Sequence, residues 1–163
     1  LTEIIKGART EELPERISDL IEKMKGMEKE LSAVRVASAI STSSELLKSA
    51  KKIGETTLIA TSFSNGLNAE ELRAVALSLK AQSTNSVILL SSVVEGKVVL
   101  ICAVTPEAIN SGVKAGELVK IGSTVLGGGG GGKDDFAQGG GVSLDKVNAA
   151  FSEIEKTIIS KVK

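Results

Sequence analysis

The residues best placed to do chemistry lie in one short segment with few side chains. Six consecutive glycines at 127–132 are followed by Lys133, two carboxylates, Phe136, Ala137, Gln138 and three more glycines. Glycine loses the most conformational freedom on folding, so a folded domain keeps such a run where the backbone needs special geometry or access. Its N–H groups can bind an anion, and phosphate is the expected one. The alternative is a flexible linker, but the charged and aromatic residues inside the run favour a binding site.

Nucleotide hydrolysis does not fit this segment. Gly127, Gly132 and Lys133 have P-loop spacing, but Asp134 replaces the hydroxyl that would bind magnesium, and no strand is expected before the run. Without histidine or further acids nearby, Asp134 and Asp135 fit loop-shaping, capping or solvated charges better than a metal site. We predict a backbone cradle that a sugar-phosphate chain can approach, with Lys133 adding charge.

Two side chains in the segment have two interpretations each. Gln138 can hydrogen-bond a ribose or base edge, or it can tie the loop's own backbone together. Phe136 is expected to pin the loop to the core, with stacking on an exposed nucleobase as the alternative. The chain has three aromatic residues, too few for a platform that stacks successive bases of any single strand.

Basic residues outside the segment extend the predicted site. Lys114 and Lys120 lie on the helix expected before the glycines, where they would flank a groove without facing the same way. Arg73 and Lys80, seven residues apart, share one face of an earlier helix and would add a basic strip. The predicted nucleic-acid-binding residues are Gly128, Gly129, Gly130, Gly131, Gly132, Lys133, Asp135, Phe136, Gln138, Gly139, Gly140, Lys114 and Lys120.

Composition argues against catalysis and against a membrane. The 163 residues include no histidine and one cysteine, Cys102, inside an apolar run, so we predict no catalytic residue and no metal site. The net charge is zero, which makes any contact with RNA local. The single thiol, the lack of an apolar stretch of about 18 residues and the lack of a secretory signal predict a cytoplasmic protein. Leu1 in place of Met suggests a piece of a longer polypeptide.

The first part of the chain predicts a helical arm. Its apolar residues step by four and three, the a/d spacing of a coiled coil. Pro14 fits only the first turn, so the helix is expected over about 11–40, followed by a second helix over about 44–52 that Gly54 ends. A second copy, or the rest of a longer chain, would cover the seam, which consists of Leu13, Ile17, Leu20, Met24, Met27, Leu31 and Val34.

The rest of the chain mixes strands and helices. We expect strands over 57–63, 87–94 and 97–105, the last two joined across Glu95-Gly96 into a hairpin central in its sheet. Helices are expected over 68–80, from Pro106 or Ala108 to 125, and from Ser143 onward. The fold class is α+β, with α/β character: a helical arm over 1–54, then a globular domain over 55–163 whose mixed sheet is flanked by helices and carries the glycine-rich loop 127–141.

The glycine segment resembles one family closely. A glycine run, a basic residue, an acidic residue, an aromatic residue or Met, Ala-Gln and further glycines occur in this order in the carboxy-terminal domain (C-Ala) of alanyl-tRNA synthetase. A more divergent form occurs in the substrate-binding domain of DHH-family phosphoesterases. Leu72-Arg73, residues 86–91 and residues 113–119 extend the resemblance over about 43–163. Asp134 departs from the family's frequent Pro and Gly139 from its common Ala, and both changes loosen the loop.

The resemblance implies a non-catalytic module that binds the outer corner of tRNA and helps aminoacylation and editing act on one tRNA. It implies tRNA, in particular tRNA-Ala, as partner, together with the upstream domains of the same polypeptide and a second copy through the arm. ATP, magnesium and zinc would belong to those upstream domains. The substrate-binding domain of a DHH-type nuclease that takes single-stranded DNA is the alternative, and a purely structural dimerisation domain is the third.

Overall fold

The structure, a computed structural model, describes residues 13–41, 43–48, 50–64 and 66–162. Two compact units divide the chain between Val34 and Arg35. The first contains most of helix α1 (Leu13–Ser41), and the second contains the sheet. The long amino-terminal helix is confirmed, while its predicted start at residue 11 lies outside the described residues.

The compact unit that contains the sheet begins inside α1, so it includes residues 35–54, which the sequence assigned to the arm. Ala39 is buried, and Val36 and Ile40 pack beside it on one core cluster, so the end of α1 belongs to the globular unit. The next helix, α2 (Ser43–Lys48), also packs there through Leu46 and Leu47.

The second predicted helix, over 44–52, is wrong in its last residues. They form strand β1 (Lys51–Ile53), which pairs antiparallel with the start of β2 (Thr56–Phe63). Gly54 has a φ of +60° and makes the turn between them rather than ending a helix. Lys51 and Lys52 lie only a few residues after α2 and favour neither a helix nor a strand, so periodicity could not separate the end of the helix from a short strand, whereas pairing with β2 decides the structure.

The sheet has six strands in the order β1-β2-β3-β4-β6-β5. The four not yet given are β3 (Ser86–Val94), β4 (Lys97–Val104), β5 (Gly130–Gly132) and β6 (Phe136–Gly141). β2 and β3 are parallel, and the other pairs are antiparallel, as a mixed sheet requires. The predicted hairpin is confirmed, with Glu95 and Gly96 at φ values of 49° and 74° in its turn. It lies at the centre of the sheet.

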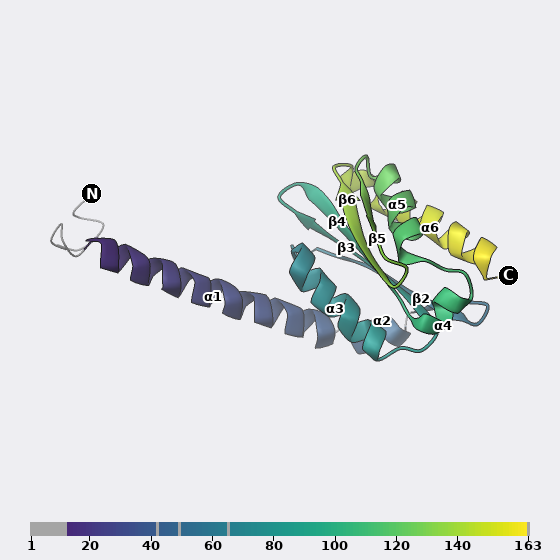
Figure 1. Ribbon diagram of the computed structural model, residues 1–163, viewed down its shortest axis with the longest axis horizontal. Coiled ribbons are helices and arrows are strands. Elements are labelled where there is room, and N and C mark those ends of the chain that lie inside the picture. The colour runs from purple at the N-terminus through teal and green to yellow at the C-terminus, as the bar shows by residue number, and fades with distance from the viewer. Residues whose placement is uncertain (1–12, 42, 49, 65, 163) are drawn as a thin grey trace. The chain divides into compact units, whose positions relative to one another are not determined.

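Helices cover both faces of the sheet (Figure 1). Helix α3 (Ala69–Ala81), which connects β2 to β3, packs on one face together with α2. Asn68 caps α3: its side chain accepts hydrogen bonds from the N–H groups of Glu70 and Glu71, at 2.9 and 3.0 Å. Helices α5 (Ala115–Val125) and α6 (Val147–Lys161) cover the other face.

The helix predicted from residue 106 to 125 is two helices. α4 (Pro106–Asn110) ends at Asn110, and Gly112, with a φ of +89°, lies between it and α5. Ser and Gly are weak helix formers, and the left-handed φ of Gly112 ends the regular turn. The predicted last helix is confirmed as α6, preceded by a single 3-10 turn at Leu144–Lys146.

Candidate nucleic-acid interface

The glycine segment forms a β-hairpin at the edge of the sheet rather than a loop. β6 pairs with β4, and β5 is the outermost strand, paired only with β6 among the described residues. Residues 136–141 are thus extended as β6, and part of the glycine run pairs with them. Glycine has low β propensity, so the sequence pattern could not reveal this strand, which is held by its neighbours.

One face of the hairpin lies against α5 and leaves no room for side chains. A Cβ on Gly130 would lie 2.9 Å from the Ser123 hydroxyl, and one on Gly139 would collide with that hydroxyl. Ser123 is fully buried and accepts a hydrogen bond of 3.1 Å from the N–H of Gly140. These glycines are explained by close packing inside the protein.

The opposite face of the hairpin is open at two glycines. A Cβ on Gly129 or Gly131 would meet no atom within 4 Å, and neither residue has the left-handed φ that favours glycine. Both residues are exposed. Nothing in the described part of the chain therefore requires the absence of a side chain at these two positions.

Strand pairing identifies the other residues on this face. Gly131 is opposite Gln138, which in turn is opposite Ile101 of β4. Opposite residues of antiparallel strands project to the same face, and Ile101 belongs to the core cluster under α3. The face of the hairpin that carries Gly129, Gly131 and Gln138 is thus the α3 side of the sheet, and we call it the open face.

The open face has polar and aromatic groups beside its glycines. Gln138 is exposed, and its side chain makes no hydrogen bond to the described residues, so the interpretation that it ties the loop together is wrong. Phe136 is half-buried against the core cluster under α3, which confirms that it pins the segment. The Arg73 guanidinium lies 4.7 Å from the centre of its ring, a cation–π contact that covers one face of the aromatic group.

Main-chain groups of the hairpin add donors along the sheet edge. The Gly140 N–H donates to the Gly129 oxygen at 3.2 Å, and the Lys133 N–H donates to the Phe136 oxygen at 2.8 Å. Because such bonds alternate along an antiparallel pair, the N–H groups of Gly130 and Gly132 point away from β6. The edge thus offers amide groups that no strand of the described residues pairs.

The tip of the hairpin is anchored by its backbone. The Ala115 N–H donates to the Asp134 carbonyl oxygen at 2.9 Å, and the Gly116 N–H donates to that of Lys133 at 3.1 Å. On the other side, the Val104 N–H donates to the carbonyl oxygen of Asp135 at 2.9 Å. These three hydrogen bonds therefore fix the position of the tip between α5 and the end of β4.

Two ion pairs bracket this tip. Lys114, at the start of α5, lies 3.1 Å from the Asp134 carboxylate, and Lys80 of α3 lies 3.3 Å from the Asp135 carboxylate. Lys133 is exposed and has no ion pair with the described residues. Three ammonium groups and two carboxylates thus gather around the tip, which leaves a small positive excess.

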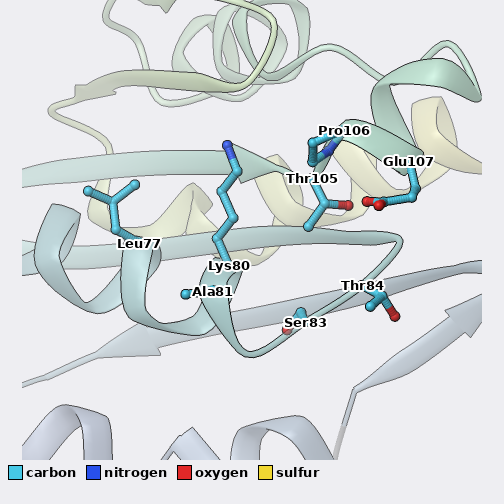
Figure 2. Close-up of a pocket in the computed structure, with 8 residues that line it drawn as sticks. All are labelled: Leu77, Lys80, Ala81, Ser83, Thr84, Thr105, Pro106 and Glu107. Carbon is cyan, nitrogen blue, oxygen red and sulfur yellow. The ribbon is translucent and has the colours of Figure 1, made fainter.

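Lys80 also lines a cavity of about 410 Å³. Figure 2 shows its side chain extending from α3 toward Thr105 and Pro106 at the start of α4. Glu107 lines the same cavity. The ammonium of Lys80 is therefore reachable from solvent next to the tip.

The structure separates the basic residues suggested by the sequence. Arg73 and Lys80 meet the hairpin from α3, on the side of the open face, through Phe136 and Asp135. Lys114 and Lys120 belong to α5, on the other side of the hairpin, and Lys120 is exposed. Because residues 127–132 are all glycine, no spacing within the run could have identified the open face, which follows from the strand register.

Two further features of the described residues bear on chemistry, the grouping of possible metal ligands and the state of the thiol. No three residues of the types His, Cys, Asp and Glu gather there as metal ligands would. Burial raises the pKa of the Cys102 thiol to about 12, so this thiol remains protonated. None of the helices in the described residues has the length and apolarity needed to cross a bilayer.

A comparison with protein families matches residues 55–160 to the DHHA1 domain. The alanine–tRNA ligase of a Nocardioides species is 37% identical over 147 residues, which are 88% of this chain and 16% of that protein. That of Thermobifida fusca is 33% identical over 161 residues, 97% of this chain and 18% of that protein. The chain thus spans less than a fifth of the length of these relatives.

Among solved structures, the C-Ala domain of Aquifex aeolicus alanyl-tRNA synthetase matches with a TM-score of 0.62 and 32% identity. The match covers 68% of this chain and 97% of that domain. These comparisons confirm the resemblance drawn from the Lys133 to Gln138 segment and its flanking glycines.

Proposed function

The chain belongs to the DHHA1 domain family and is homologous to the C-Ala domain of alanyl-tRNA synthetase, and from this premise we propose that it binds tRNA through the open face. Gly129 and Gly131 carry the proposal, because nothing among the residues that the structure describes accounts for their missing side chains. A ligand that approaches the backbone closely accounts for both. Lys133, Gln138 and the amides of the sheet edge suit the phosphates and sugars of a nucleic acid.

We propose that the bound part is the outer corner of tRNA, recognised by shape, as the family resemblance implies. Side chains cannot reach the base edges in the deep, narrow major groove of an RNA helix. Its ribose hydroxyls and phosphates remain accessible. A surface of backbone amides, one amide side chain and a few cations fits that kind of recognition. In this role the domain binds without catalysing and holds one tRNA for the aminoacylation and editing centres of a longer polypeptide.

Filter binding with tRNA-Ala tests the proposal. Gly131→Val places a branched side chain on the open face where the fold has space, so we expect binding to weaken about tenfold or more, a change of about 1.4 kcal/mol. Gly26→Val is the matched control, since a Cβ there also meets nothing within 4 Å but lies on α1. Equal affinity of the two variants for tRNA would contradict the proposal.

The same assay separates the other functional classes. Preference for single-stranded DNA over tRNA would favour the substrate-binding domain of a nuclease. Indifference to tRNA-Ala, to other tRNAs and to single-stranded DNA would leave a purely structural domain.

We propose a second role, assembly, for the arm. Its seam residues Leu20, Met24, Met27 and Val34 are 54%, 56%, 61% and 65% exposed, unusual for a regular apolar stripe. A helix of a second copy, or of the upstream polypeptide, would cover them. Sedimentation at several concentrations distinguishes the two: dimerisation that Leu20→Asp abolishes supports the second copy, and a monomer at every concentration supports the upstream helix.

A further inference from the structure

We propose that Asp135 restrains nucleic-acid binding by holding Lys80, and that a phosphate of the bound strand takes the place of its carboxylate. The inference rests on the proposed function of the open face. It assigns Lys80 as a phosphate-binding residue and Asp135 as its built-in competitor.

The carboxylates of the tip are not needed to shape it. Backbone carbonyls of Lys133, Asp134 and Asp135 accept the hydrogen bonds that hold the tip, and these bonds do not involve the side chains. Exposed ion pairs add little to stability, typically about 0.2–1 kcal/mol. The side chain of Asp135 is 53% exposed, so its pairing with Lys80 has another consequence: it neutralises an ammonium beside the open face.

Lys80 is positioned to change partners. Its ammonium donates to both the carbonyl oxygen and the carboxylate of Asp135 at 3.3 Å, longer than the usual 2.7–2.9 Å of charge-assisted bonds. Its side chain is 19% exposed, so most of the stem is held by the protein while the ammonium borders the cavity described above. A phosphate oxygen can replace the carboxylate without movement of α3.

The second ion pair provides a natural control. Asp134 and Lys114 form a pair of the same type at 3.1 Å on the same tip, but Lys114 belongs to the α5 side. Asparagine has the shape of aspartate without its charge, so Asp135→Asn and Asp134→Asn remove one charge each and keep every backbone anchor of the tip.

Filter binding of tRNA over a range of salt concentrations tests the inference. We expect Asp135→Asn to bind about two- to fivefold more tightly, as removal of an exposed pair allows. The dependence of log affinity on log salt should steepen by up to about 0.7–0.9, the value for one phosphate contact, because the variant has no carboxylate that takes up a cation when the phosphate displaces it. Asp134→Asn should gain less in both quantities.

Variants of Lys80 test whether the gain in affinity comes from its ion pair with Asp135. Lys80→Gln should weaken binding and make the salt dependence shallower by the same amount, and Asp135→Asn added to Lys80→Gln should give no further gain. Two results would overturn this inference without affecting the proposed function. One is an Asp135→Asn variant that binds tRNA no more tightly than the wild type, and the other is a gain in affinity that persists in the double variant. Absence of binding by the wild type would instead overturn the proposed function.

Discussion

Strand β4 and the glycine hairpin beside it are neighbours in one sheet, yet they are held by opposite means. In β4, Leu100 and Cys102 are fully buried on one face and Ile101 and Ala103 on the other, so side chains fix the strand between two core clusters. In the hairpin, backbone approaches backbone and α5 because side chains are missing. Packed side chains therefore hold the centre of the sheet, whereas close backbone contacts, which the absence of side chains permits, hold its edge.

The reactivity of Cys102 tests the description of β4 and has the largest expected effect. Its pKa is raised by burial from about 9 to about 12, so at pH 8 its thiolate fraction is about a thousandfold below that of an exposed thiol. We expect alkylation by iodoacetamide to be slower than in the unfolded chain by at least this factor. Rapid alkylation of the native protein would mean that β4 is not central.

The raised pKa of Cys102 also sets a pH dependence. The folded state holds this proton more tightly than the unfolded state, so the stabilisation is complete below about pH 9 and is lost as the pH rises toward 12. Denaturant unfolding between these values should show the decline, and Cys102→Ala should remove it.

Leu100→Ala measures the contribution of side chains to β4. Leu100 is fully buried, and shortening a buried leucine to alanine typically costs about 2–5 kcal/mol. Urea denaturation followed by circular dichroism should give a loss in this range. A loss below about 1 kcal/mol would remove the distinction between the centre and the edge of the sheet.

Gly140→Ala measures the opposite requirement in the hairpin. The added Cβ would collide with the backbone oxygen of Val98, which cannot move aside as a flexible side chain can. Overpacking of this kind typically costs about 1–3 kcal/mol, and the same denaturation experiment measures it. An unchanged stability would show that the hairpin is not held by close backbone approach.

Gly131→Ala is expected to have the smallest effect on stability. The added methyl group meets nothing within 4 Å, so the free energy of unfolding should change by no more than about 0.5 kcal/mol. Compared with Gly140→Ala, it separates glycines needed for folding from glycines left free for a ligand. Equal losses for the two variants would erase that separation.

The elements predicted well are those with strong local signals. The helix predicted over 68–80 is α3, and Glu95-Gly96 forms the predicted turn between two apolar strands. The glycine hairpin and β1 could not be predicted in the same way, because glycines and two lysines have no preference for a strand. β1 is a strand because it pairs with β2, and β5 is a strand because it pairs with β6, and neither pairing can be read from the local sequence.

The candidate site was predicted in position but not in orientation. Lys133, Phe136 and Gln138 within the glycine run identified the segment in the sequence. Which of its glycines lie on the open face depends on the strand register with β4. The register also moves the basic contribution from Lys120 to Arg73 and Lys80, which only the packing of α3 beside the hairpin could reveal.

The most direct test of the open face is a backbone-amide NMR titration of the chain with tRNA. We predict that the largest shift changes occur at Gly129, Gly131, Lys133 and Gln138, with Lys120 and the rest of α5 less affected. Binding of tRNA that perturbs α5 and α6 and leaves these four amides unchanged would contradict the account.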